Sequence, residues 1–210
     1  MSVIESNHRF TEQFVSESAD IGAARARSIE LGIDPVSPAT GAQIAVIAAA
    51  TNPLNMIEIG TGAGVSGLWL FEGAPDATLT TIDIEADHSA EARTAFSEAG
   101  ILAARSRLIT GRAIDVLPRM NERSYDLVLV DADVESVIDY VEHGLRLVRR
   151  GGTVLVTHAL WGGRVADPVQ RDEATSGFRF LLREIAKSEA VICSLSPVGD
   201  GLLQLTKRAD

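Results

Sequence analysis

From residue 53 onward, short apolar runs alternate along the chain with segments in which apolar residues recur every three or four positions. The runs are typical of buried strands, and the periodic segments are typical of amphipathic helices. Their alternation predicts a parallel sheet whose strands are joined by crossover helices. We expect strands at residues 55–60, 78–84, 106–110, 125–131 and 152–159, and helices at residues 64–74, 88–100, 112–120 and 134–152, the last ending on a glycine pair.

The C-terminal part of the chain departs from this alternation. A helical pattern over residues 177–190 is followed by two apolar runs, residues 191–198 and 202–207, which are joined by Gly-Asp-Gly. A tight glycine-containing connection between two strand-like runs is typical of a hairpin. We therefore expect an α/β fold with a seven-stranded mixed sheet that ends in an antiparallel pair.

The first 52 residues carry helical patterns, and Pro35 and Pro38 bracket a break before the apolar segment 39–50. The sequence contains no obvious linker, internal repeat or low-complexity segment. The simplest organisation is a single domain over residues 1–210, with an N-terminal helical cap (1–52) and a core (53–207).

Composition excludes several classes of protein. A hydrophobic fraction of 46% is enough for a full core, and no apolar run reaches the roughly 18 residues of a membrane span. The N-terminal residues lack the pattern of a secretory signal, so we expect a cytoplasmic protein without a membrane partner. A net charge of −10 with scattered basic residues argues against nucleic acid as a partner. Cys193, inside an apolar run, is expected to be a buried small hydrophobe.

A glycine-rich loop follows the first expected strand and has two interpretations. Gly62, Gly64 and Gly67 have the spacing of a dinucleotide fingerprint, with Asp83 downstream. However, the first glycine after the strand is Gly60, and in that register a valine occupies the third glycine position. The fingerprint therefore fits only if it begins two residues late.

Glu58 favours a different cofactor. A carboxylate at the end of the first strand would face the ligand, where it would repel a pyrophosphate and attract a sulfonium or ammonium group. S-adenosylmethionine carries both cations and no phosphate, so we expect this cofactor rather than a nicotinamide dinucleotide. Asp83, at the end of the second strand, would accept hydrogen bonds from the ribose hydroxyls.

The loop occurs with five further segments in a fixed order: TTIDIE, TGRAIDVLP, DLVLVDAD, ALWGGRV and PVGDGL. Together they resemble the bacterial S-adenosylmethionine-dependent O-methyltransferases related to caffeoyl-CoA and catechol O-methyltransferases, over residues 30–207. The resemblance implies a Rossmann-like class I methyltransferase fold, methyl transfer to a hydroxyl oxygen of a small, aromatic or phenolic molecule, and a homodimer. It implies cofactor contacts from Val36, Ser37, Glu58, Gly60, Thr61, Gly62, Ser66, Asp83, Ile84, Gly111, Arg112, Ala113, Asp131 and Asp133.

The sequence departs from this family at its metal site. The family holds a divalent cation, usually magnesium, with an aspartate that matches Asp131 and an Asp-Asn pair at the end of the fifth strand. Thr157 and His158 occupy the positions of that pair, and Val134 replaces the lysine that can take the proton. Since Asp131 would be the sole anionic ligand, we do not expect a family-type magnesium site.

Three roles are open for His158. It can act as general base beside Asp131, bind a transition metal with Asp131, or be a hydrogen-bonded histidine at a strand end. Trp161 can wall an aromatic acceptor pocket or simply pack. The cluster of Glu85, Asp87 and His88 is expected to cap a helix rather than bind metal.

The family resemblance leaves a rival function and an assembly question. The rival is an S-adenosylmethionine-binding protein that has lost catalysis. The replacement of the family's metal ligands and lysine supports it. The homodimer is suggested by the resemblance and by apolar N-terminal segments, residues 21–32 and 44–50, that the sheet alone would not bury. The alternative is that these helices close over the pocket of their own monomer.

Overall fold

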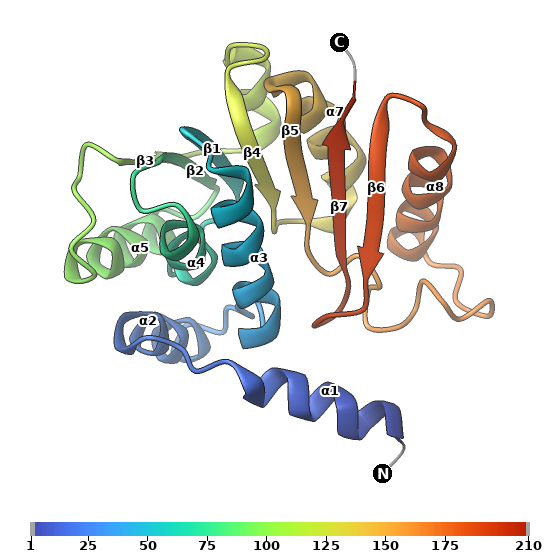
Figure 1. Cartoon of the computed structure of the whole chain (residues 1–210), viewed down its shortest axis with the longest axis horizontal. Coiled ribbons are helices and arrows are strands. Elements are labelled where there is room, and N and C mark those ends of the chain that lie inside the picture. The colour runs from blue at the N-terminus through green and yellow to red at the C-terminus, as the bar shows by residue number, and fades with distance from the viewer. Residues whose placement is uncertain (1–2, 209–210) are drawn as a thin grey trace.

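A computed structural model describes residues 3–208, which form one seven-stranded sheet flanked by helices (Figure 1). The strands are β1 (Asn55–Ile59), β2 (Thr78–Asp83), β3 (Ser106–Thr110), β4 (Tyr125–Val130), β5 (Val148–Val156), β6 (Val191–Ser196) and β7 (Leu202–Lys207). The α-helices are α1 (Val3–Phe14), α2 (Ala19–Glu30), α3 (Pro38–Thr51), α4 (Val65–Gly73), α5 (Ala86–Glu98), α6 (Ala113–Val116), α7 (Val137–Leu147) and α8 (Glu173–Lys187). Two short 3-10 helices are η1 (Leu117–Arg119) and η2 (Val134–Ser136).

The strand order is β3-β2-β1-β4-β5-β7-β6. Strands β1 to β5 pair in parallel, whereas β7 is antiparallel to both β5 and β6. This confirms the predicted Rossmann-like α/β fold with a mixed sheet and a C-terminal hairpin. The chain turns from β1 outward to β3 and then returns to β4, so β1 and β4 flank a topological switch point. Open α/β sheets bind ligands at the carboxyl ends of the strands beside such a point.

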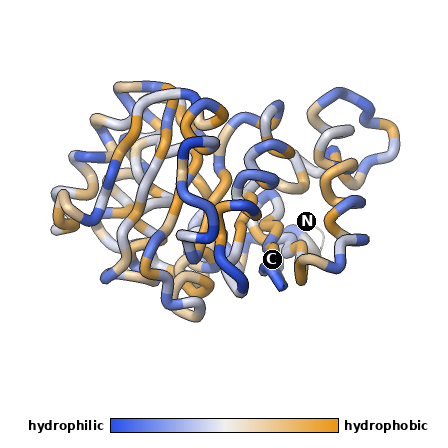
Figure 2. Tube along the Cα trace, turned by 90° about the horizontal axis from the view of Figure 1, so that it is seen from above, coloured by the Kyte–Doolittle hydropathy of each residue, from blue (hydrophilic) through white to orange (hydrophobic). Residues whose placement is uncertain are grey.

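The strands inside the sheet, such as β1, β2 and β4, are buried on both faces. Along β1, Met56 belongs to the apolar cluster that includes residues of α2 to α5, whereas Ile57 and Ile59 belong to the cluster that includes residues of α6 to α8. Successive strand side chains point to opposite faces, so Glu58 shares the face of Met56. In Figure 2 the trace changes repeatedly between hydrophobic and hydrophilic residues, as expected of elements that face a core on one side.

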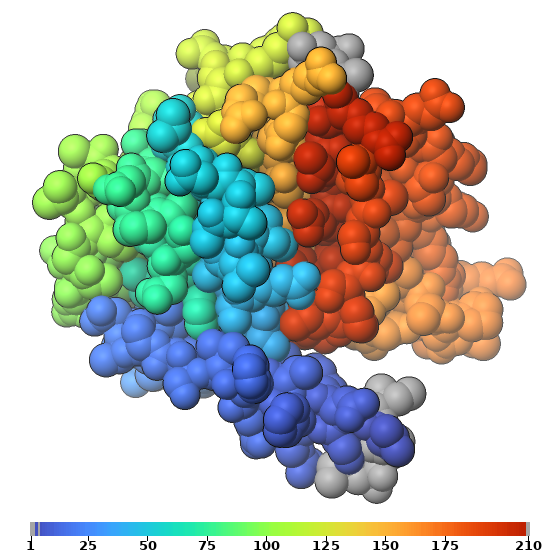
Figure 3. All heavy atoms as spheres, viewed as in Figure 1, coloured from blue at the N-terminus to red at the C-terminus, as the bar shows by residue number. Residues whose placement is uncertain are grey.

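The N-terminal segment forms three helices, as expected for the helical cap. Helix α3 packs against α4, while α1 reaches out beyond the body of the molecule (Figure 3). The carboxylate of Glu12 ties α1 to the start of α3, because it accepts hydrogen bonds from the Ser37 hydroxyl at 2.9 Å and from the Ala39 main-chain N–H at 3.1 Å. Phe10 and Phe14 of α1 remain 70% and 76% exposed.

The helix expected over residues 134–152 ends earlier than its glycine pair suggested. Helix α7 stops at Leu147, and residues 148–152 begin β5. The cause is an irregular register: Val148 pairs with Tyr125, and regular pairing with β4 resumes only at Thr153. Gly151, with φ of 79°, therefore lies in the irregular part of β5 and does not end the helix.

The expectation that Cys193 is buried is wrong. Cys193 is exposed, as are its neighbours on both sides in β6. The reason is the position of β6 at the edge of the sheet, where of its six residues only Val191 is fully buried.

Within residues 3–208, none of the helices has the length and apolar character needed to cross a membrane.

Candidate active site

A cavity of about 470 Å³ opens at the carboxyl ends of β1, β2 and β4, beside the switch point. Its volume lies in the range of small-molecule and cofactor sites. All but two of the predicted cofactor contacts line it: Val36, Gly60, Thr61, Gly62, Ser66, Asp83, Ile84, Gly111, Arg112, Ala113, Asp131 and Asp133. The two that do not are Ser37 and Glu58.

The glycine loop is shaped by its backbone. Gly60, Gly62 and Gly64 have φ angles of 92°, 51° and 95°, a region that residues with a side chain rarely adopt. At Gly60 there is also no space, because a Cβ atom would collide with the main-chain oxygen of Asp131. The loop therefore brings the ends of β1 and β4 into direct contact at the cavity wall.

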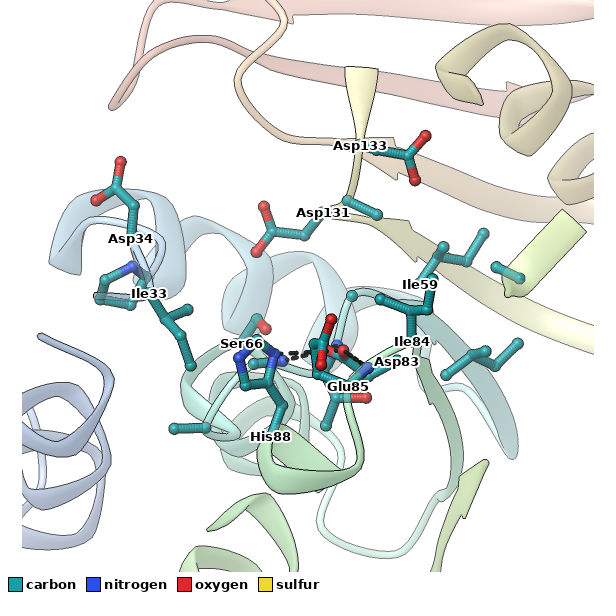
Figure 4. A pocket seen from close by; sticks show the side chains of 18 of the residues that line it. Ile33, Asp34, Ile59, Ser66, Asp83, Ile84, Glu85, His88, Asp131 and Asp133 are labelled. Atoms are coloured by element: carbon teal, nitrogen blue, oxygen red, sulfur yellow. Dashed lines mark hydrogen bonds and ion pairs between the residues drawn. The ribbon is translucent and has the colours of Figure 1, made fainter. Parts of the chain in front are cut away.

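Asp83 fixes this loop to the end of β2. Its Oδ2 accepts hydrogen bonds from the main-chain N–H groups of Thr61 at 3.0 Å and Gly62 at 2.9 Å, and its Oδ1 accepts from Glu85 N–H at 2.9 Å. His88 Nδ1 lies 3.3 Å from the same Oδ1 (Figure 4). A carboxylate offers about four acceptor sites, so the three backbone bonds leave one site, on Oδ1, which His88 Nδ1 faces.

Glu58 lies behind the cavity wall, contrary to the expectation that it faces the ligand. Its side chain points to the α4 side of the sheet and is fully buried. Its Oε2 accepts a 2.6 Å hydrogen bond from the hydroxyl of Thr81, which lies 2.6 Å from the hydroxyl of Thr61. Burial raises the pKa of Glu58 to about 8, since desolvation disfavours the charged form. The Glu58 carboxyl is thus connected to the glycine loop through the hydroxyls of Thr81 and Thr61.

Ser37 also departs from its predicted place. It is the N-cap of α3, where its hydroxyl accepts a hydrogen bond from Thr40 N–H and donates one to Glu12. Val36, one residue earlier, is the residue of this pair that lines the cavity.

Acidic side chains gather at the cavity. Asp131 lies between Asp34 and Asp133 in the view of Figure 4. The Asp133 carboxylate accepts from Tyr140 OH at 2.6 Å and from Ser136 N–H at 3.1 Å. Burial alone would raise the pKa of Asp133, but these hydrogen bonds outweigh it and lower the pKa. Burial and the bond to Asp133 raise the pKa of Tyr140 to about 12, so the phenol stays protonated at neutral pH.

Asp131, Thr157 and His158 are brought together by the parallel pairing of β4 and β5. The Thr157 hydroxyl donates to Asp131 Oδ1 at 2.5 Å, and His158 Nε2 lies 3.6 Å from the same oxygen. Burial raises the pKa of Asp131 despite the opposing effects of His158 and Thr157, and the nearby Asp34 raises it further. His158 has φ of 53°, which is uncommon for a residue with a side chain.

This trio does not fit magnesium. Magnesium requires hard oxygen ligands in near-octahedral geometry, and here one carboxylate faces a neutral hydroxyl and an imidazole. The Thr157 hydroxyl already donates its hydrogen to Asp131. Residues 3–208 contain no group of three or more histidine, cysteine, aspartate or glutamate side chains placed to hold a metal ion.

Of the other candidate residues from the sequence, only some line the cavity. Trp161 packs on Phe178 with ring centroids 5.9 Å apart and does not line the cavity. Of the acidic cluster after β2, Glu85 and His88 line the cavity and Asp87 does not. Glu85 precedes α5, but its side chain makes no capping hydrogen bond.

The cavity-lining residues that sequence reasoning missed include Asp34, His88 as a partner of Asp83, and Tyr140. Asp34 lies two residues before Val36, a predicted cofactor contact, so the sequence offered a signal for it. Tyr140 lies inside a helical pattern and carried no signal, because its contact with Asp133 requires η2 to turn the chain back.

Comparison with known proteins identifies the family. The profile of the O-methyltransferase family matches residues 20–209. The chain belongs to the O-methyltransferase family. A curated relative from Mycobacterium sp. (strain KMS), whose name assigns it provisionally to the O-methyltransferases, is 48% identical over 193 residues, which cover 91% of this chain and 88% of the relative. The resemblance inferred from the motifs is thereby confirmed.

Solved structures of similar proteins share the whole architecture of this O-methyltransferase. A protein from Corynebacterium glutamicum superposes with a TM-score of 0.91 and 29% identity, covering 100% of this chain and 99% of its own. The O-methyltransferase TomG from Streptomyces achromogenes, involved in tomaymycin synthesis and solved in complex with SAM, has a TM-score of 0.84 and 28% identity, with 100% of both chains covered.

Proposed function

We propose that this O-methyltransferase transfers the methyl group of S-adenosylmethionine to a hydroxyl oxygen of a small, aromatic acceptor. The observation that carries the proposal is the cavity that brings together the glycine loop, Asp83 and Asp131 at the switch point of the sheet. The similarity to TomG, which was solved with this cofactor, supports the choice of cofactor.

The charge of the cavity agrees with a cationic ligand. Its lining includes five carboxylate side chains but only one arginine and one histidine: Asp34, Asp83, Glu85, Asp131, Asp133, Arg112 and His88. A doubly charged pyrophosphate would be repelled there, whereas a sulfonium and an ammonium group would be attracted. This is a stronger argument against a dinucleotide than Glu58, which lies outside the cavity.

We assign the cavity residues to parts of the cofactor as follows. The loop of Gly60, Thr61 and Gly62 would hold the methionine end, and Asp83 would accept from a ribose hydroxyl. The adenine would lie among the side chains near the ends of β2 and β3: Ile84, Gly111, Arg112 and Ala113. Val36 would cover the cofactor, while Glu58 would act indirectly through Thr81 and Thr61.

The acceptor would bind on the Asp131 side of the cavity. When bound, the cofactor supplies an electrophilic methyl group and is left as S-adenosylhomocysteine. The acceptor hydroxyl must lose its proton as its oxygen attacks. His158 would accept that proton: it lies outside the cavity lining but 3.6 Å from Asp131, which lines the cavity. We propose that this pair does the work without a metal ion, because the trio with Thr157 does not fit magnesium.

The second candidate is an S-adenosylmethionine-binding protein without catalysis, favoured by the replacement of the family's ligands and lysine by Thr157, His158 and Val134. Incubation with labelled S-adenosylmethionine and a panel of phenols and catechols separates the two. Production of S-adenosylhomocysteine that depends on the acceptor supports the transferase. Tight cofactor binding without turnover on any acceptor would favour the binding protein.

We further propose a homodimeric, cytoplasmic protein without nucleic acid partners, organised as one domain with the helical cap (1–52) on the core (53–207). The exposed aromatic pair of α1, Phe10 and Phe14, supports the dimer, since its ring centroids lie 6.5 Å apart on a helix that reaches beyond the body.

A further inference from the structure

The turn between β6 and β7 meets the segment that carries His158. Its central residue, Asp200, has its Oδ2 3.6 Å from His158 Nδ1, and the opposite ring nitrogen, Nε2, lies 3.6 Å from Asp131. The imidazole is thus flanked by two carboxylates, one from the cavity wall and one from the hairpin. Neither Asp200 nor His158 belongs to the cavity lining, and Asp200 is linked to Asp131 of the cavity wall through His158.

Asp200 is held firmly against the His158 segment. Both of its carboxylate oxygens lie 2.7 Å from the main-chain N of Gly162, which donates to them. Its main-chain oxygen accepts from Leu160 N–H at 2.9 Å, and that of Gly201 accepts from Ala159 N–H at 3.0 Å. The turn and the segment after β5 therefore form one hydrogen-bonded unit.

The glycines of this turn allow it to pack closely against two neighbouring segments. A Cβ on Gly201 would lie 2.8 Å from the main-chain N of Leu160, and a Cβ on Gly199 would collide with the Thr40 hydroxyl of α3. Both glycines also have positive φ, 93° and 56°. The turn consequently packs tightly between α3 and the His158 segment.

We propose that Asp200 is a positioning residue that accepts a hydrogen bond from His158 Nδ1–H and so keeps Nε2 as the nitrogen that faces Asp131 and the acceptor. In a neutral imidazole one nitrogen donates and the other accepts, and a partner of one nitrogen selects the tautomer. The present separations are those of ion pairs, and catalytic hydrogen bonds commonly tighten when ligands bind. The proposal rests on the proposed role of His158 as proton acceptor, but its tautomer can be measured without turnover.

The test is NMR of protein labelled with ¹⁵N-histidine, at a pH well above the ordinary imidazole pKa of about 6.5. The chain has four histidines, so the ring signals of His158 are identified by their loss in His158→Gln. We expect His158 in the Nδ1–H form in the wild type. In Asp200→Asn, which keeps an oxygen for Gly162 N–H but places an amide where the carboxylate was, the signals should shift toward the Nε2–H form.

Kinetics supply the second readout. Asp200→Asn should lower kcat by roughly 10-fold or more, a part of the 10²- to 10⁴-fold that a positioned base provides, with little change in KM for the cofactor. The matched control is Asp167→Asn, since Asp167 also accepts a main-chain N–H, from Val169, and forms no hydrogen bond or ion pair with a histidine within residues 3–208. It should change neither the tautomer nor kcat.

Each outcome decides the proposal. An Nε2–H or doubly protonated His158 in the wild type overturns it, even if Asp200→Asn does not fold, and so does an unchanged tautomer in a folded Asp200→Asn. If the tautomer shifts in Asp200→Asn but the protein has no turnover, the positioning role of Asp200 is upheld. The proposed function is then refuted instead.

Discussion

Thr157 donates its hydroxyl hydrogen to Asp131 Oδ1 across the ends of β5 and β4, at 2.5 Å. The family resemblance implies a metal-binding carboxylate at the position of Thr157, beside the aspartate that matches Asp131. A ligand has thus been replaced by a hydrogen-bond donor to the remaining ligand. The buried Asp131 accepts here from a neutral hydroxyl instead of sharing a metal with a second carboxylate, which bears on metal dependence.

Metal chelation should leave turnover unchanged. Because Thr157 and His158 provide no anionic ligand, EDTA is expected to have no effect on S-adenosylhomocysteine formation. The double variant Thr157→Asp, His158→Asn restores the family's ligand types and should become magnesium-dependent. If chelation stops the wild-type enzyme and zinc, manganese or cobalt restores it, Asp131 and His158 hold a transition metal instead.

His158 should control the rate rather than cofactor binding. Replacement by alanine removes the proton acceptor beside Asp131, so we expect a loss of about 10²- to 10⁴-fold in kcat. Calorimetry should give nearly the wild-type affinity for S-adenosylhomocysteine. His143→Ala, in α7 and away from the cavity, serves as the control. Full turnover in His158→Ala would leave His158 as a strand-end residue only.

Asp83 should control cofactor affinity. Asp83→Ala loses the acceptor of two loop N–H groups and of the proposed ribose contact, so binding of S-adenosylmethionine should weaken by about 1–3 kcal/mol. The control is Asp87→Ala, in which an exposed carboxylate of α5 is removed. This variant should bind S-adenosylmethionine with wild-type affinity. The same calorimetry with NAD should give no binding, and a comparable affinity for NAD would refute the cofactor assignment.

Glu58 should make stability fall as pH rises. Its folded pKa of about 8 lies above the ordinary value near 4.3, so the folded state keeps a proton that the unfolded state releases. The stabilisation is complete below the unfolded pKa and is lost as pH rises through the folded pKa. As the pH rises from 5 to 8, the unfolding free energy of the wild type should therefore fall by roughly 3 kcal/mol relative to that of Glu58→Gln.

Urea denaturation of the cofactor-free protein at several pH values measures this effect. The exposed Glu98→Gln is the control and should follow the wild type across the range. Parallel pH profiles of wild type and Glu58→Gln would mean that Glu58 is ionised in the folded protein at neutral pH.

The aromatic pair of α1 should lie at the dimer interface. Phe10→Ser with Phe14→Ser removes exposed apolar area from a helix that contacts the rest of the chain mainly through α3. We expect the wild type to sediment as a dimer at micromolar concentration and the double variant as a monomer. Phe180→Ser, a half-exposed phenylalanine of α8, should remain dimeric. A wild-type monomer would refute the dimer itself.

The sequence predicted most elements because their signals are local. A buried strand such as β4 needs only its own apolar run, and the glycine loop needs only its own φ angles. Parallel strands end at one edge of a sheet, so Gly60, Asp83 and Asp131 could be expected around one cavity before any coordinates were known. The family followed from the order of such segments along the chain.

The tertiary structure alone decided what depends on contacts between distant segments. The direction of Glu58 is set by which helices cover each face of β1, and alternation along the strand leaves that choice open. Strand β6 exposes Cys193 because it became the edge of the sheet. His158 meets Asp200 because β7 pairs with β5, which carries the hairpin turn to the end of the neighbouring strand. Such pairings join residues far apart in sequence, so no local pattern records them.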